Sequence, residues 1–169
     1  NEGVEKASMS KIAKAAGVSS STIYIYFDNK ADMINKLYLT AKQELGSVIC
    51  KDMIDEMSVE AASMSWMRNY FKYLVANPLQ FSFIEQFHNS PSITPETEAK
   101  GLQYLAPLIE LHKRGVKEQV LKDYPLPLMK AFIFDPIMSL ARSHINKELE
   151  VTDELLQKGL EMTWSAIKR

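Results

Sequence analysis

One segment near the amino end limits what this chain can fold into more than any other part of it. The segment covers residues 8–30 and reads SMSKIAKAAGVSSSTIYIYFDNK. Ser8 is a favourable N-cap, and apolar residues follow it at helical spacing as far as Ala16. Gly17 can then take the left-handed conformation that ends a helix and turns the chain. The segment therefore predicts two short helices joined by a tight turn.

The second of these helices carries small hydroxyl groups and tyrosines on its outer side. Ser19 or Ser20 can cap it, and Ile23 and Phe27, four residues apart, are expected to anchor its inner face. Hydroxyl groups and lysines bind phosphates or base edges, and isoleucine can contact a thymine methyl group. A helix-turn-helix places such a helix in the major groove. We therefore predict double-stranded DNA as a partner, with Ser21, Thr22, Tyr24, Ile25, Tyr26 and Lys30 available for contacts.

Residues 12–34, IAKAAGVSSSTIYIYFDNKADMI, resemble the DNA-binding motif of the tetracycline-repressor (TetR) family of bacterial regulators. The resemblance is close from about residue 3 to residue 45. It implies a homodimeric, all-α, ligand-responsive transcription factor, usually a repressor. Carried over to this sequence, the family's DNA contacts are Ser20, Ser21, Thr22, Tyr24, Ile25, Tyr26 and Lys30. The family's first helix is almost wholly absent before Gly3, so we expect the DNA-binding domain to be incomplete at its start.

Composition agrees with such a protein without requiring it. A chain of 169 residues, 46% hydrophobic, can bury a core in one or two small domains. The net charge of −1 gives only weak support for DNA binding, because acidic residues nearly match the lysines of the first 45 positions. The single cysteine, Cys50, cannot form an intramolecular disulfide, and no apolar run is long enough to cross a bilayer. We expect a cytoplasmic, nucleoid-associated protein.

Beyond residue 30 the sequence continues as helices without a convincing strand. The predicted helices cover about 30–49, 58–76, 79–87, 95–121 with a break near Gly101 or Pro107, 127–147 and 152–169. The first of them connects the DNA-binding head to the body. We expect an all-α protein with a helix-turn-helix domain at residues 1–46, and an effector-binding and dimerisation domain at residues 47–169.

The middle helices concentrate aromatic residues and methionines. In the TetR family such helices enclose a cavity for a small, often hydrophobic effector. The candidate effector contacts are Trp66, Tyr70, Phe83, Phe87, His88, Tyr104, Phe132, Asp135 and Met138. Packing in an ordinary helical core is the competing interpretation for all of them. For Asp135 we prefer a structural role, as an N-cap followed by Pro136 at the first position of a restarted, kinked helix.

The last two predicted helices carry apolar residues on more than one face, and such helices must bury the additional apolar faces as well. In a TetR-like arrangement they pair with their twofold mates in a four-helix interface, and burial within one body is the alternative. We expect the homodimer, because a single helix-turn-helix reads little sequence alone. Its reading helices would lie roughly 34–36 Å apart and match a palindromic operator. The residues of these faces are Ile137, Leu140, Ala141, His144, Ile145, Leu155, Leu156, Leu160, Met162, Trp164 and Ile167.

No pattern in the chain is typical of catalysis. There is no nucleophile elbow, phosphate loop or CxxC pair, and the three histidines lie too far apart for a metal motif on one helix. We expect neither an enzyme nor a cofactor or metal. The predicted function is a repressor that a small hydrophobic or amphipathic effector releases from its operator. A constitutive dimeric DNA-binding protein without an effector is the alternative, and a small helical enzyme is a weaker one.

Overall fold

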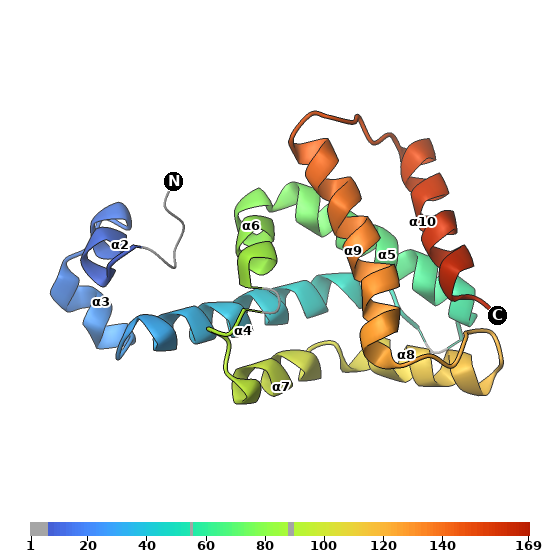
Figure 1. Cartoon of the computed structure of the whole chain (residues 1–169), viewed down its shortest axis with the longest axis horizontal. Coiled ribbons are helices and arrows are strands. Elements are labelled where there is room, and N and C mark those ends of the chain that lie inside the picture. The colour runs from blue at the N-terminus through green and yellow to red at the C-terminus, as the bar shows by residue number, and fades with distance from the viewer. Residues whose placement is uncertain (1–6, 55, 88–89) are drawn as a thin grey trace.

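The chain folds as an elongated bundle of helices, shown as a computed structural model in Figure 1. The structure describes residues 7–54, 56–87 and 90–169. Within these residues the one extended pairing is an isolated bridge between Leu121 and Lys168, so the predicted all-α class is confirmed. The helices are α2 (Met9–Ala15), α3 (Ser20–Tyr26), α4 (Lys30–Ile49), α5 (Val59–Ala76), α6 (Pro78–Phe87), α7 (Pro95–Gln103), α8 (Ala106–Lys117), α9 (Leu126–Ile145) and α10 (Asp153–Ile167).

Local capping chemistry sets the helix boundaries at the amino end. The Ser8 hydroxyl accepts a hydrogen bond from the Lys11 backbone N–H at 3.2 Å, and the Ser19 hydroxyl accepts one from the Thr22 N–H at 3.0 Å. Between the two helices Gly17 has a φ of +71°, the left-handed conformation that the turn requires. The helix-turn-helix geometry predicted for this segment is therefore confirmed. Side-chain caps also begin α4, α5, α7 and α10, at Asn29, Ser58, Thr94 and Thr152.

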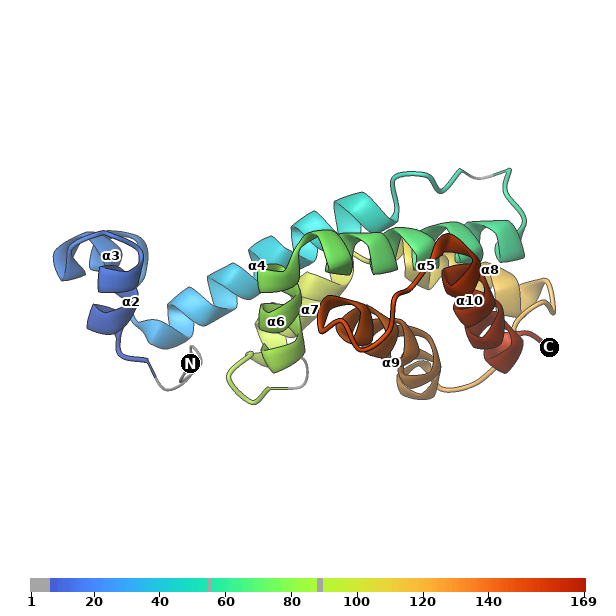
Figure 2. The same ribbon diagram turned by 90° about the horizontal axis from the view of Figure 1, so that it is seen from above.

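Helix α4 joins a small head to a larger body, as the sequence predicts for the connector. The head consists of α2, α3 and the start of α4, which share a core of Met9, Ala13, Ile23 and Met33. It projects from one end of the molecule in Figures 1 and 2. From Ile34 onward, α4 packs against the body. The predicted domain boundary at residue 46 falls inside this helix, and the division into two domains stays a prediction.

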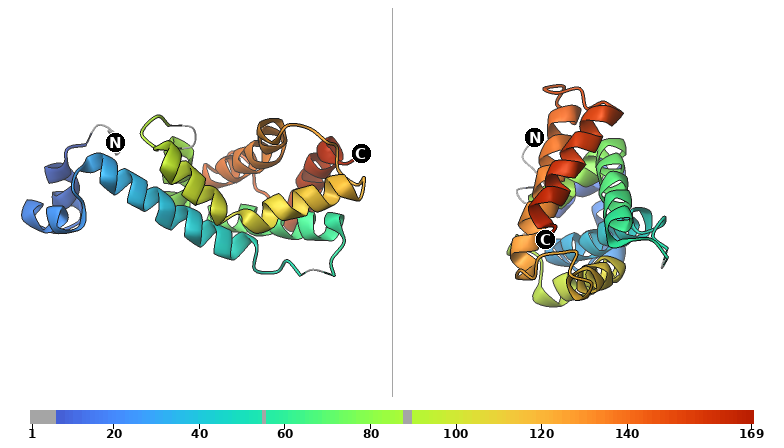
Figure 3. Two further views of the ribbon diagram at one scale, coloured as in Figure 1. Left: turned by 90° about the horizontal axis from the view of Figure 1, so that it is seen from below. Right: turned by 90° about the vertical axis from the view of Figure 1, so that its right-hand side faces the viewer.

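Helix α5 is the centre of the body and contacts α4, α6, α8, α9 and α10. Its inner side chains, among them Met67, Tyr70 and Leu74, are almost completely buried. Seen along the long axis in the right view of Figure 3, the α9–α10 pair lies on one side, α5 on the other, and α7 and α8 lie at the base. None of the helices within the described ranges is both long and apolar enough to span a bilayer.

The predicted break in the helix after Pro95 is confirmed. Gly46 of α4 explains how the α7–α8 junction packs against α4. Helix α7 ends at Gln103 and α8 begins at Ala106. At this junction the backbone of Tyr104 lies so close to α4 that a Cβ atom on Gly46 would overlap the Tyr104 carbonyl oxygen. Glycine therefore allows α4 to cross the α7–α8 junction at backbone contact distance.

The predicted helix restart at Asp135 is wrong. Helix α9 runs continuously from Leu126 to Ile145, with Pro136 inside it. Proline removes one backbone hydrogen bond, to the carbonyl of Phe132 four residues earlier. Both Phe132 and Pro136 are exposed, so solvent can hydrate that carbonyl. Packing of the opposite face against α5 and α10 holds the helix together.

Most of the apolar surplus of α9 and α10 is buried within the chain itself. Ile137, Leu156, Leu160 and Trp164 are at most 4% exposed, because the two helices pack on each other and on α5. For these residues the interpretation as burial within one body is confirmed. Among the side chains of α9 and α10 that the structure describes, the large apolar ones that remain exposed are Leu128, Phe132 and Met162.

Candidate DNA-binding surface and ligand cavity

The residues predicted to contact DNA gather at the tip of the head, on α3 and the first residue of α4 (Figure 1). Tyr24, Ile25 and Tyr26 are 54%, 77% and 67% exposed. Ser20 and Ser21 are exposed as well, whereas Thr22 and Lys30 are half-buried. Clustered exposed aromatic and aliphatic side chains are typical of a surface that a partner covers.

The hydroxyl groups at the start of α3 form a small network around the cap. The Ser19 hydroxyl lies 2.7 Å from the Ser21 hydroxyl and 2.8 Å from that of Thr22. These contacts fix the orientation of both side chains in the first turn, where free backbone N–H groups favour phosphate. The first turn of α3 thus presents ordered polar groups.

Lys36 fixes the corner between α3 and α4, a role that the sequence analysis missed. Its ammonium group donates hydrogen bonds to the Tyr26 carbonyl at 3.1 Å and to the Asp32 carboxylate at 2.8 Å. It also lies 5.6 Å from the centre of the Phe27 ring. The hydrogen bond from Lys36 holds the pKa of Asp32 below its usual value. The spacing of Asp32 and Lys36, four residues apart on one helix, is the signal that could have identified the pair.

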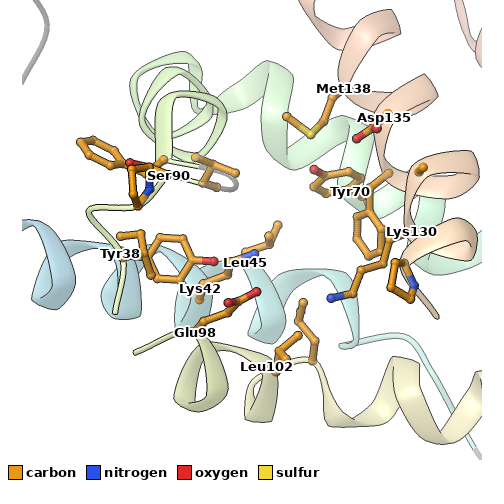
Figure 4. A pocket seen from close by; sticks show the side chains of 18 residues that line it. Tyr38, Lys42, Leu45, Tyr70, Ser90, Glu98, Leu102, Lys130, Asp135 and Met138 are labelled. Atoms are coloured by element: carbon orange, nitrogen blue, oxygen red, sulfur yellow. The ribbon is translucent and has the colours of Figure 1, made fainter. Parts of the chain in front are cut away.

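A cavity of about 610 Å³ lies in the body between α4, α5, α6, α7 and α9 (Figure 4). Most of its wall is apolar, from Leu45, Ile84, Phe87, Pro91, Ile93, Leu102, Leu105, Pro127, Ala131, Phe134 and Met138. Its polar side chains are Tyr38, Lys42, Tyr70, Ser90, Glu98, Lys130 and Asp135. The volume falls in the range of small-molecule sites, and a mainly apolar wall with a few polar groups is their usual composition.

Four of the nine predicted effector residues line this cavity: Tyr70, Phe87, Asp135 and Met138. Burial raises the pKa of the Tyr70 hydroxyl, and the negative charge of Asp135 adds to this effect. These four residues are up to 68 positions apart in the sequence, from Tyr70 to Met138, and the fold places them around one cavity. Tyr70, Phe87 and Met138 also belong to the buried core, so their role as effector contacts stays a prediction.

The other predicted effector residues lie elsewhere. Trp66 packs behind the wall, with its ring 5.3 Å from that of Phe134, and the ring of Phe83 lies 4.7 Å from that of Phe87. Tyr104 and Phe132 have exposed side chains and do not line the cavity. His88 lies outside the described residues. The cavity thus gives no support to an effector contact from Tyr104 or Phe132.

Five polar residues of the cavity were not predicted: Tyr38, Lys42, Ser90, Glu98 and Lys130. Burial and, after it, the positive charge of Lys130 lower the pKa of Lys42 to about 8. Its ammonium group lies 5.3 Å from the centre of the Tyr38 ring. Lys42 follows Tyr38 by four residues and precedes Leu45 by three, which places it on the inward stripe of α4. That spacing is the signal that could have identified it.

A smaller cavity of about 70 Å³ adjoins the first. The two share Leu102, Leu105, Lys130 and Phe134 in their walls. The smaller one continues between α5, α8 and α9 among mainly apolar side chains, which include the predicted effector residue Trp66. Phe134 therefore stands between a large space with polar groups and a small apolar one.

Comparison with protein families covers both halves of the chain. Residues 1–37 match the model for bacterial regulatory proteins of the tetR family, and residues 63–168 match the model for the tetracyclin repressor-like C-terminal domain. The chain belongs to the TetR family. It is a DNA-binding transcription regulator and not an enzyme. Within the described ranges no group of three or more histidine, cysteine, aspartate or glutamate residues could hold a metal ion.

Two relatives extend over nearly the whole chain, and a third extends over about half of it. The crystal structure of a TetR-family regulator from Marinobacter aquaeolei superposes with a TM-score of 0.90 at 26% identity, over 99% of this chain and 90% of that one. An HTH-type transcriptional regulator of Haemophilus influenzae is 22% identical over 99% of this chain and 88% of its own length. The fatty acid metabolism regulator protein of Bacillus subtilis is 32% identical over 92 residues, 54% of this chain and 42% of that protein.

Replacing Lys36 by methionine is expected to weaken DNA binding about two- to tenfold, because the Tyr26 carbonyl and the Asp32 carboxylate lose their common donor. Fluorescence anisotropy with a labelled duplex measures the effect. Lys113→Met is the matched control, since Lys113 pairs with Glu110 on α8, at the other end of the molecule from the head. Equal affinities of the Lys36 and Lys113 variants would contradict the role of Lys36.

Proposed function

We propose that this regulator is a dimeric repressor that a small hydrophobic or amphipathic effector releases from a palindromic operator. The observation that carries the proposal is the place of the cavity. Helix α4 holds the head at one end and contributes Tyr38, Lys42 and Leu45 to the cavity wall. A molecule in the cavity therefore touches the same helix that positions α3.

The proposed mechanism requires the effector to discriminate between two arrangements of the body. An effector that binds one arrangement better shifts the population towards it, and only this difference in affinity does so. Movement of α4 then changes the separation of the two reading heads, so that they no longer match both half-sites. In the head, we propose DNA contacts from Ser20, Ser21, Thr22, Tyr24, Ile25, Tyr26 and Lys30.

The cavity favours effector sensing over constitutive DNA binding. A body that served only for dimerisation would gain stability from a filled interior, since empty apolar volume costs dispersion contacts. The cavity has a volume of about 610 Å³, which is suited to a ligand. The fatty acid metabolism regulator of Bacillus subtilis, a relative over about half of this chain, supports an effector with an apolar chain.

The function is tested by titrating candidate effectors into the protein bound to a labelled operator, selected beforehand from random duplexes. The proposal predicts that a molecule occupying the cavity lowers operator affinity at least about tenfold, a coupling free energy of ordinary size for allosteric proteins. An effector that saturates the cavity and leaves operator affinity unchanged would contradict the release mechanism.

We propose that the dimer forms through the outward faces of α9 and α10, where Leu128, Phe132 and Met162 are exposed. Phe132→Glu is expected to raise the dissociation constant of the dimer about tenfold, because a carboxylate would be buried without a partner. Sedimentation velocity over a range of concentrations measures it. The control is Ile54→Glu, which changes an apolar residue of similar exposure between α4 and α5. A dimer equally stable in both variants would place the interface elsewhere.

A further inference from the structure

The two lysines in the main cavity indicate which class of molecule it takes. We propose that the cavity binds an amphiphile whose anionic group lies between the ammonium groups of Lys42 and Lys130, and whose apolar part fills the remaining space. The inference rests on the proposed effector function and deepens it, since it assigns chemistry and orientation to a ligand that the function leaves open.

The first support is the position of the two positive charges. Lys42 extends from α4 and Lys130 from α9, and both line the same space from opposite elements (Figure 4). In the part of the chain that the structure describes, neither lysine forms an ion pair with a carboxylate within 4.0 Å. Two unpaired like charges in a partly apolar space repel each other, and an anion between them relieves that repulsion.

The acidic residues of the cavity do not supply that anion. Glu98 and Asp135 line the wall, but both are exposed residues with access to solvent. Lys130 acts on Lys42 more strongly than Glu98 does, and the two act in opposite directions. Among the described residues neither carboxylate forms an ion pair with Lys42, so an anion from outside can take that place.

The second support is the apolar remainder of the wall. Ile84, Phe87, Phe134 and Met138 line the same space as the lysines. Inorganic anions would leave this surface hydrated or empty, whereas an aliphatic or aromatic part attached to the anion would cover it. Methionine and phenylalanine side chains adapt to varied apolar shapes. The ligand class is therefore an acid with a substantial apolar part.

An anion held by both lysines also connects the ligand to the head. Lys42 belongs to the helix that carries the head, and Lys130 belongs to the helix on the other side of the cavity. Charge-assisted contacts to both helices fix the distance between them. A neutral ligand of the same shape occupies the space without this bridge, so the anion is expected to contribute most of the differential affinity that a switch needs.

The test compares ligands of one shape and different charge on the full chain without DNA. Isothermal titration with linear carboxylates from hexanoate to tetradecanoate is expected to show binding, and the best of them should bind at least about tenfold more tightly than the alcohol of equal length. The amine of equal length should bind more weakly than the alcohol. Equal affinities for acid and alcohol, or no binding by any of the acids, would overturn the inference.

Variants locate the anion. Lys42→Met and Lys130→Met should each lower carboxylate affinity about tenfold and leave alcohol affinity within about twofold. Lys72→Met, at an exposed lysine of α5, should change neither. Thermal melting by circular dichroism verifies that each variant is folded. If a variant does not fold, the comparison of acid, alcohol and amine on the unmodified chain still tests whether the cavity prefers an anion. Unchanged carboxylate affinity in a folded Lys42 or Lys130 variant would overturn the placement.

The charge of Lys42 makes the binding depend on pH. With a pKa of about 8, Lys42 loses its proton as the pH rises through 8, so carboxylate affinity should fall about tenfold between about pH 7 and about pH 9. The charged neighbours are Glu98, Lys130 and Asp135, and Tyr38 and Tyr70 stay neutral because burial raises their pKa. Lys42→Met should lack this dependence. If carboxylate affinity falls equally with pH in the Lys42→Met variant, a group other than Lys42 titrates.

Operator release is measured separately, so the two proposals fail in different ways. A carboxylate that binds between the lysines and leaves the operator complex intact supports the ligand class and contradicts the repressor mechanism. A neutral or cationic molecule that occupies the cavity and releases the operator supports the mechanism and contradicts the ligand class.

Discussion

Tyr24→Ala is expected to lower operator affinity about 100-fold, the largest loss that any single change in the head should produce. The side chain is 54% exposed at the centre of α3 and reaches out from the head. Loss of one polar or stacking contact costs about 1–1.5 kcal/mol, and a dimer loses two of them. Anisotropy titrations with the selected operator measure the affinity, and thermal unfolding should be unchanged because the ring is not part of the core.

Tyr124→Ala is the matched control for this prediction. The exposed fraction of Tyr124, 49%, is close to the 54% of Tyr24. Tyr124 lies between α8 and α9, at the far end of the body from the head. Its removal should leave operator affinity within about twofold. If the two variants bind the operator equally well, α3 is not the reading helix.

Gly46→Ala is expected to destabilise the protein by about 2–3 kcal/mol, as measured by the free energy of unfolding in urea. The new Cβ atom would overlap the carbonyl oxygen of Tyr104, and a backbone atom cannot rotate away as a side chain can. The overlap outweighs the gain in helix propensity of about 1 kcal/mol that alanine brings. Since α4 must then move from the α7–α8 junction, effector response should weaken as well.

Gly159→Ala separates overlap from helix propensity. Gly159 is also inside a helix, but its nearest neighbour is one flexible atom of the Leu140 side chain, Cδ2, at 3.1 Å from the added Cβ. This variant should be neutral or stabilised by up to about 1 kcal/mol. Equal stability of the Gly46 and Gly159 variants would contradict the close crossing of α4 and the α7–α8 junction.

The head could be predicted from sequence because its structure follows from local chemistry. Two serine caps and Gly17 determine where α2 and α3 begin and where the chain turns, and each acts within four residues of its own position. Ile23 then identifies the buried face and, by exclusion, the exposed one. The family resemblance covers this same stretch. Its DNA contacts stay predictions, because exposure permits binding without demonstrating it.

The cavity was only partly predictable because five separate helices form it. Tyr70, Phe87 and Met138 were found as bulky apolar residues, but the same criterion selected Phe132, which faces outward on α9. Lys42 was counted among the charges of the DNA-binding end, since the sequence does not show which body helix approaches α4.

The error at Pro136 has the same origin. Tertiary packing against α5 and α10 kept the backbone helical where the local rule for an aspartate followed by proline predicts a new N-terminus.

Selection of random duplex DNA by the purified chain, followed by sequencing of the bound pool, is the most direct test that this protein is a dimer reading DNA through α3. We predict enrichment of an inverted repeat whose half-site centres lie about one helical turn apart, roughly 34–36 Å. A pool without any enriched sequence, or one enriched in a single unrepeated half-site, would contradict it.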